Sequence, residues 1–121
     1  MEDVLQEKAY KFALRVVRLS EHLHKERHEY ILSRKILDSG TNVALFIEEG
    51  KQGENRPDFI HRYSLANKEA FKSHLLLRLL RDADYIPAAH ADSVLSDCGE
   101  LQALLITSLR TARKSEKDFQ L

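Results

Sequence analysis

Six histidines occur among the 121 residues, and they are the first side chains to consider for chemistry because neutral imidazole is a common metal ligand. His24 and His28 would share one face of a helix, as neighbours at i and i+4, if a helix continues that far. His22 and His24 do not share a face. The remaining histidines are His61, His74 and His90. These three lack a recognised ligand spacing, so we predict solvated surface histidines, no metal site and no cofactor.

The carboxylates likewise form no recognisable catalytic set. Glu48 and Glu49 are adjacent and diverge around a helix, whereas Glu69 is followed at i+3 by Lys72, a spacing typical of an exposed ion pair. A di-iron site would need a Glu-x-x-His motif on each of two helices, and the chain does not contain two such motifs. Phosphate-binding glycine loops, nucleophile elbows and Ser-His-Asp or Cys-His orders are also missing. We predict no catalytic residues, so the chain is not expected to be an enzyme.

Basic residues are the remaining candidates for a binding function. Given ~3.6 residues per turn, one stripe within an arc of about 100° on the first expected helix contains Lys8, Lys11, Arg15, Arg18, His22 and Lys25. A second cluster near the end of the last expected helix contains Arg110, Arg113, Lys114 and Lys117. Such a pattern is most often a solvated face, and the alternative is contact with nucleic-acid phosphates. Because 19 basic and 19 acidic residues cancel, any such binding must come from these local patches.

Helices are the elements that would position these side chains. Apolar residues recur along the chain at spacings of three and four, and this pattern predicts four helices. We expect helices at about residues 3–26, 29–50, 57–84 and 88–117, the third beginning at Pro57. Only four Gly and two Pro occur, which leaves little turn material for a many-stranded sheet. The sequence therefore predicts an all-α fold: one antiparallel up-down four-helix bundle over residues 1–121, with a polar tail from about 117. A three-helix bundle with one long bent arm is the alternative.

The compartment is predicted from the first residues and from the cysteine content. Cys98 is the single cysteine, which excludes an intramolecular disulfide and favours a small buried hydrophobic residue over a reactive thiol. The polar start of the chain lacks the pattern of a signal peptide. No apolar run approaches the ~20 residues of a membrane span. We expect a soluble, cytoplasmic protein that does not bind a membrane.

Small residues at the centre of the second expected helix suggest a close contact. Ser39, Gly40 and Thr41 interrupt an otherwise well-patterned helix, although an interior Gly costs about 1 kcal/mol relative to Ala. They predict tight backbone packing, a local bend or a subunit contact. Phe71 and Leu75 lie outside the main apolar seam of the third expected helix. We predict that all five residues contribute to an oligomer interface, with a broad core as the alternative.

A resemblance to a known family becomes specific along the same stretch. It is carried by Ser39-Gly-Thr41, Ile47-Glu-Glu-Gly50, Asp58-Phe-Ile60, Leu65-Ala-Asn-Lys-Glu-Ala70, Leu77-Arg-Leu-Leu80 and Asp84-Tyr-Ile86. Over about residues 10–115 the chain resembles the 23S rRNA intervening-sequence protein family, four-helix-bundle proteins distantly similar to the accessory variability protein of diversity-generating retroelements. It departs from the family at Ala44-Leu-Phe46, where members often have Gly-Ala-Asn. The resemblance implies a bundle that assembles into a ring, commonly a pentamer, with no accepted enzymatic activity.

Two functions follow as hypotheses. The first is a non-enzymatic homo-oligomeric scaffold or interaction module linked to RNA, whose surface holds RNA or an enzyme that acts on nucleic acid. The second is weak, sequence-independent nucleic-acid binding through the basic stripe. An enzyme or ligand carrier in the bundle core would need inward-facing polar groups, and the sequence offers none.

Overall fold

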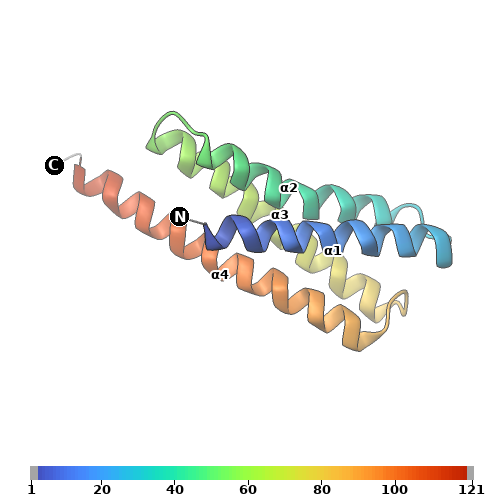
Figure 1. Ribbon diagram of the computed structural model, residues 1–121. Coiled ribbons are helices and arrows are strands. Elements are labelled where there is room, and N and C mark those ends of the chain that lie inside the picture. The colour runs from blue at the N-terminus through green and yellow to red at the C-terminus, as the bar shows by residue number, and fades with distance from the viewer. Residues whose placement is uncertain (1–2, 120–121) are drawn as a thin grey trace.

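Four helices form the whole of the regular structure over the part of the chain that can be described. The computed structural model describes the backbone of residues 3–119 and the side chains of residues 3–115. Helix α1 spans Val4–Glu26, α2 spans Leu32–Lys51, α3 spans Arg56–Asp82 and α4 spans Ala88–Phe119. They run alternately up and down, joined by short turns (Figure 1). The predicted all-α antiparallel four-helix bundle is therefore confirmed.

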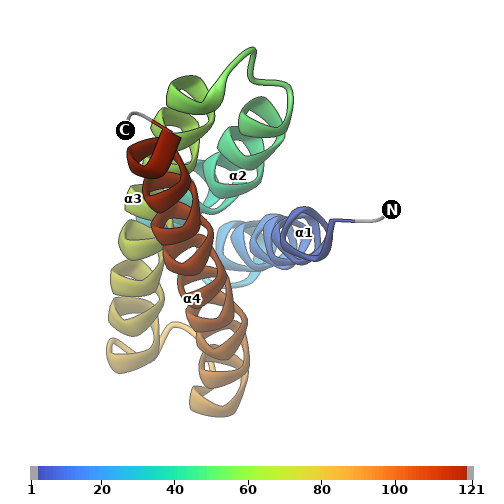
Figure 2. The same ribbon diagram turned by 90° about the vertical axis from the view of Figure 1, so that its left-hand side faces the viewer.

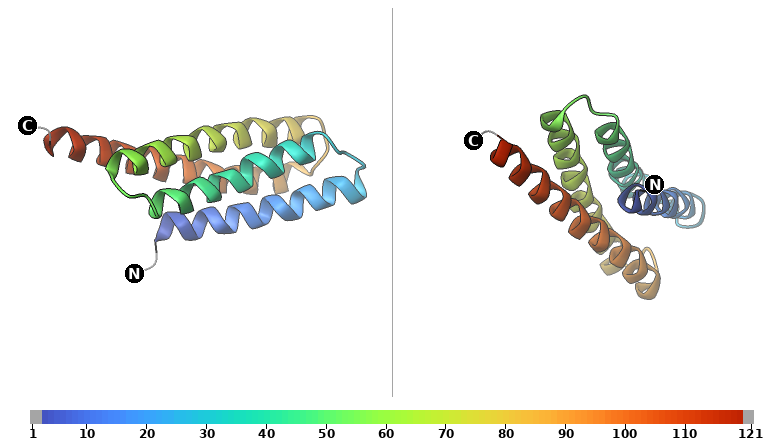
Figure 3. Two further views of the ribbon diagram at one scale, coloured as in Figure 1. Left: turned by 90° about the horizontal axis from the view of Figure 1, so that it is seen from above. Right: turned by 60° about the vertical axis from the view of Figure 1, so that its left-hand side comes forward.

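Each helix packs against its neighbours in chain order, and α4 returns to contact α1. The contact between α1 and α4 is the smallest of the four, and over the described residues the backbones of the diagonal pairs α1–α3 and α2–α4 do not approach each other closely. Figure 2 shows the reason: α1 and α4 cross at a wide angle, so they diverge along much of their length. The end of α4 extends beyond the start of α1 (Figure 3).

The helix ends follow from local hydrogen bonds. Asp3 caps α1, because its Oδ1 accepts a hydrogen bond from the backbone N–H of Gln6 at 3.0 Å, and Asn55 caps α3 in the same way. Helix α2 begins three residues later than the expected position 29. Glu29 is not helical; instead its Oε1 accepts from the backbone N–H of Ser33 at 2.8 Å and satisfies one of the free donors at the start of α2.

The core lies between the four helices and is built from the residues that carry the three-four spacing. The largest fully buried side chains are Phe12, Val16, Leu23, Ile36, Val43, Ile47, Leu77, Leu80, Val94, Cys98, Leu101 and Leu105. Three of the buried serines are paired through their hydroxyls: Ser73 Oγ donates to Ser39 Oγ at 2.8 Å, and Ser20 Oγ donates to the carbonyl of Ser33 at 3.0 Å. Burial of these hydroxyls is tolerated because each has a partner.

The small residues at the centre of α2 pack inside the subunit. Ser39 and Gly40 are buried, Ser39 against α3 and Gly40 against Val16 of α1. Thr41 is half-buried, and its hydroxyl donates to the carbonyl of Leu37 at 2.6 Å. The chain's own helices therefore cover Ser39 and Gly40, which is the tight backbone packing that the sequence allowed; an oligomer contact at these two residues stays a prediction.

Candidate functional site: a cationic cleft and an outward apolar row

Most of the cationic stripe on α1 is neutralised by carboxylates. Lys8 Nζ lies 2.7 Å from Glu100 Oε1, and Arg15 Nη1 lies 2.7 Å from Asp97 Oδ2. Both acidic partners come from α4. The hydrogen bond and charge of Glu100 raise the pKa of Lys8. The sequence pattern of α1 could not reveal these pairs, because their acidic members are more than eighty residues away along the chain.

Two further cations of the stripe form pairs within α1 itself. Lys11 Nζ lies 3.0 Å from Glu7, and Lys25 Nζ lies 2.8 Å from Glu21, both at i,i+4 spacing. Exposed pairs of this kind contribute little to stability, but they reduce the positive potential of the surface. Arg18 differs, because it has no ion-pair partner among the side chains of residues 3–115. The stripe is therefore a row of mixed charge with one unpaired guanidinium.

The second basic cluster lies far from that guanidinium. Arg113 Nη2 donates to Ser64 Oγ at 3.1 Å, whereas Arg110 and Lys114 are exposed and form no ion pair with any side chain described. Lys117 belongs to α4, but its side chain lies outside the described residues. Arg110 is twenty residues along α4 from His90, which lines the same pocket as Arg18, so about 30 Å of helix separates the two ends. The two basic groups therefore do not form one continuous surface.

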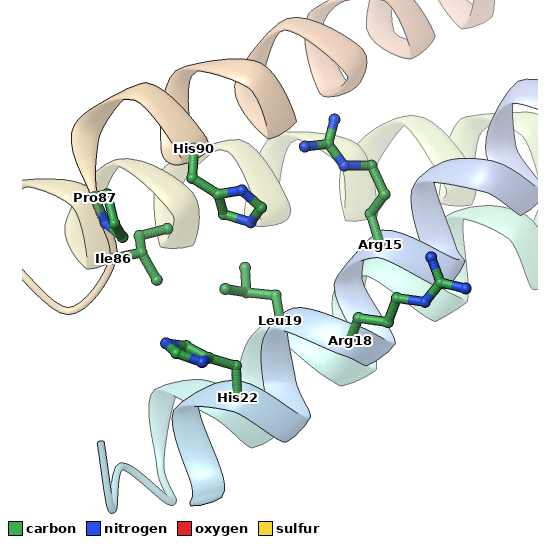
Figure 4. Close-up of a pocket in the computed structure, with 7 residues that line it drawn as sticks. All are labelled: Arg15, Arg18, Leu19, His22, Ile86, Pro87 and His90. Carbon is green, nitrogen blue, oxygen red and sulfur yellow. The ribbon is translucent and has the colours of Figure 1, made fainter. Parts of the chain in front are cut away.

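A cleft of about 520 Å³ opens where α1 faces the start of α4. It is lined by Arg15, Arg18, Leu19, His22, Ile86, Pro87 and His90. Figure 4 shows His22 of α1 and His90 of α4 on opposite walls with Leu19 between them, and the two arginines toward the other end. None of the lining residues is acidic. The crossing of α1 over α4 thus gathers basic and donor side chains that are distant in the sequence.

The other histidines are not brought together. Helix α1 ends at Glu26, and His28 follows in a left-handed conformation with φ 53°, so His24 and His28 do not share a helical face. The ring of His24 instead packs edge-on against Tyr30, with 4.6 Å between centroids. Over the described residues, no group of three or more His, Cys, Asp and Glu side chains is arranged to hold a metal ion.

Glu69 and the thiol of Cys98 make contacts within the bundle. Glu69 pairs with Lys72 at 3.3 Å, as their spacing predicts, and also accepts from Asn42. Burial, together with the charge of Asp97, raises the pKa of Cys98 to about 12, and its Sγ donates to the carbonyl of Ala70 at 3.3 Å. A thiol with so high a pKa is a poor nucleophile at neutral pH.

Two rows of large apolar side chains remain in contact with water. On α3, Phe71, Leu75 and Leu79 are 54%, 49% and 46% exposed and follow one another at i, i+4 and i+8; we call them the α3 row. On α1, a second row consists of the exposed residues Tyr10, Leu14 and Val17; we call it the α1 row. The α3 row contains two of the predicted interface residues, whereas none of the three residues of the α1 row was predicted.

No described helix has both the length and the apolar character needed to cross a membrane.

Comparison with known proteins identifies relatives of the whole bundle. The sequence profile of the family described as 23S rRNA-intervening sequence protein matches residues 2–107. A solved structure from Bacteroides thetaiotaomicron VPI-5482, described as a protein with unknown function from the S23 ribosomal protein family, is 36% identical and superposes with a TM-score of 0.86. The alignment covers 88% of this chain and 98% of that chain. No curated protein sequence matches.

Proposed function

The chain belongs to the 23S rRNA-intervening sequence protein family, and we propose that it acts as a non-enzymatic, cytoplasmic homo-oligomeric scaffold. The observation that carries this proposal is the α3 row. Three large apolar side chains, each about half exposed, lie in line on the outer face of one helix. Leaving such surface in water costs about 25 cal/mol per Å², and a row rather than a scatter of apolar residues is typical of an interaction surface.

The position of the α1 row favours a second copy of the chain as the partner. Helices α1 and α3 are diagonal in the bundle, so their outward faces point in opposite directions. A contact between the α3 row of one subunit and the α1 row of the next would be heterologous, that is, head to tail. Heterologous contacts close into rings when the rotation between subunits permits. Five copies is the number that the family resemblance favours.

Sedimentation equilibrium at micromolar concentration tests the assembly. The wild-type protein should have a mass several times the 14.0 kDa of the chain, and Leu75→Glu should reduce it to that of a monomer while leaving the helical circular dichroism unchanged. Leu45→Glu is the matched control, because Leu45 is equally exposed (50%) but lies on α2, outside both rows. A wild-type monomer would overturn the proposal.

The head-to-tail geometry has its own test. Leu14→Glu, in the α1 row, should also give monomers. Each of the two variants keeps one intact row, so mixing Leu14→Glu with Leu75→Glu should restore a single contact and yield a heterodimer. An isologous contact between two α3 rows would instead leave Leu14→Glu assembled and give no heterodimer on mixing.

A second candidate function is sequence-independent nucleic-acid binding. It is favoured by Arg18, Arg110 and Lys114, which have no carboxylate partner among the described side chains. A ring would repeat these charges and multiply weak phosphate contacts. The cargo of the scaffold would then be RNA, or an enzyme bound to it.

Electrophoretic mobility shift separates this candidate from a scaffold that holds only protein. Binding of RNA should fall steeply between ~50 and ~200 mM salt, because each neutralised phosphate releases a counterion. Arg18→Gln with Arg110→Gln should weaken binding to all sequences alike, whereas Lys11→Gln, which removes a cation already paired with Glu7, should have little effect. No shift at the lower salt concentration would exclude RNA as a direct ligand.

A further inference from the structure

We propose that the cleft between α1 and the start of α4 is a binding site for the phosphate group of a nucleotide. The site is formed by helices of one subunit, so it does not depend on the assembly proposed above. Its volume of about 520 Å³ lies within the usual range of small-ligand pockets, ~300–1,000 Å³.

The lining supplies the donors that a phosphate requires. The guanidinium groups of Arg15 and Arg18 and the imidazoles of His22 and His90 are the polar side chains of the cleft. Guanidinium presents a planar fork of N–H donors that matches the oxygens of a phosphate, and an imidazole donates through one or both ring nitrogens. No carboxylate lines the cleft to repel an anion.

Arg18 is the residue with the most charge available to a ligand. Arg15 is held by Asp97 at 2.7 Å, so part of its charge is already compensated. On α1, Glu21 follows Arg18 by one turn, and it is already engaged by Lys25 at 2.8 Å. We therefore assign the main phosphate contact to Arg18, with His22 and His90 donating from the two walls.

The start of α4 adds positive potential at the same end of the cleft. The first turn of α4 contains no acidic residue, so no carboxylate in that turn compensates the positive end of the helix dipole. His90 itself belongs to this first turn. The dipole supplements the side chains and would favour an anion placed between His90 and His22.

The rest of the lining is apolar and favours a ligand with a ring over a bare anion. Leu19 and Ile86 are buried, and Pro87 adds an apolar edge beside them. Apolar lining next to guanidinium and imidazole groups fits a nucleobase or ribose joined to a phosphate. The phosphate could belong to a free mononucleotide or to a nucleic-acid chain, and both present the same chemistry to Arg18.

Isothermal titration calorimetry of the full chain at low salt tests the site with four probes: adenosine 5′-monophosphate, adenosine, orthophosphate and a short single-stranded oligoribonucleotide. If the phosphate belongs to a free nucleotide, adenosine monophosphate should bind more tightly than orthophosphate, and adenosine should not bind. If the phosphate belongs to a nucleic-acid chain, the oligoribonucleotide should bind and the mononucleotide should bind only weakly. No binding of any phosphate-bearing probe would overturn the proposal.

Two substitutions locate the binding. Arg18→Gln and His90→Gln should each weaken binding of the phosphate-bearing probe about tenfold or more, since each removes a contact to a charged group. Both side chains are exposed, so the fold should survive, and an unchanged melting temperature checks this. Lys11→Gln, on α1 but outside the cleft, should bind like the wild type. Equal binding by all three variants would place the phosphate elsewhere and overturn the assignment.

The oligomeric assembly and the phosphate site in the cleft can be tested independently of each other. Arg18→Gln and His90→Gln should leave the sedimentation mass of the wild type unchanged, because neither residue belongs to the α1 row or the α3 row. Leu75→Glu should in turn keep the calorimetric affinity for the phosphate-bearing probe. Loss of that affinity in Leu75→Glu would show that the cleft is incomplete within one subunit and overturn its assignment to a single chain.

Discussion

Gly40 of α2 faces Val16 of α1 so closely that a Cβ on Gly40 would stand 2.7 Å from Cγ1 of Val16 and 2.8 Å from its Cγ2. Val16 is fully buried, so it has little freedom to move aside. The absence of a side chain at Gly40 is thus what allows α1 and α2 to approach at the centre of the bundle. This contact accounts for a helix-interior glycine that would otherwise weaken α2.

We expect Gly40→Ala to lower the free energy of unfolding by about 1–2 kcal/mol. Overpacking against Val16 costs about 1–3 kcal/mol, and the better helix propensity of Ala returns up to about 1 kcal/mol of it. Urea unfolding at one fixed protein concentration measures the change. Gly99→Ala is the matched control: apart from the adjoining residues and backbone of α4, nothing lies within 4 Å of a Cβ at that position, so the same substitution in α4 should stabilise the protein by up to about 1 kcal/mol.

The pair Gly40–Val16 can also be tested by a double-mutant cycle. Val16→Ala removes both methyl groups that crowd Gly40 and leaves a cavity on its own. In the Val16→Ala background, Gly40→Ala should therefore lower the free energy of unfolding by less than it does in the wild type. This difference is the coupling energy between the two positions. Additive effects of the two substitutions would contradict the contact.

The stability of the bundle should depend on pH through Asp3, which joins the start of α1 to the end of α2. Its Oδ1 accepts from Gln6, and its Oδ2 lies 2.6 Å from Lys51 Nζ. Partial burial acts to raise the pKa of Asp3, but the hydrogen bonds from Lys51 and Gln6 and the charge of Lys51 outweigh it and hold the pKa below the ordinary value of 3.8. A carboxyl whose pKa is lower in the folded state stabilises the fold above its unfolded pKa.

Asp3→Asn should therefore reduce the free energy of unfolding at pH 7, by up to about 1 kcal/mol. The difference from the wild type should shrink as the pH falls below about 4, because the unfolded chain then takes up the proton at Asp3 before the folded chain does, and the advantage is lost once the folded carboxyl is protonated too. Asn can still cap α1, whereas Asp3→Ala should lose about 1 kcal/mol more at every pH. Urea unfolding across a pH series measures both. A difference between Asp3→Asn and the wild type that does not vary with pH would contradict the pKa assignment.

Cys98 should be unreactive in the native protein. Burial raises its pKa to about 12, so almost no thiolate is present at pH 8, and the side chain is closed off within the core. Ellman's reagent should detect no thiol in the folded protein and one thiol per chain after unfolding in guanidinium chloride. Rapid labelling of the native protein would show that α3 and α4 separate locally near Ala70.

Zinc should leave the melting temperature unchanged, because a metal stabilises only if it binds the folded state. The six histidines are distributed over α1, α3, α4 and the turn after α1. The two that meet in the cleft, His22 and His90, are joined there by arginines rather than by a further ligand. Differential scanning calorimetry with and without equimolar zinc checks this. A reproducible rise, retained after dialysis, would indicate a site that uses His22 and His90.

The sequence by itself determined the four helices and the bundle. Apolar residues at spacings of three and four mark the inner face of each helix, and Asp3, Asn55 and Pro57 act within a few residues of the helix starts that they define. These signals are local, so they can be interpreted without knowing what packs against them. Where a local signal was ambiguous, as at the start of α2, the expected boundary was three residues early.

Only the tertiary structure decided which side chains meet. It placed Glu100 and Asp97 of α4 on the cations of α1, and it brought His90 to face His22 across a cleft. It also showed that Gly40 packs against Val16 of α1, where the sequence left tight packing, a local bend and a subunit contact open. The angle at which α1 crosses α4 sets these encounters. That angle depends on how the side chains of both helices interlock, which the periodicity of either helix alone does not specify.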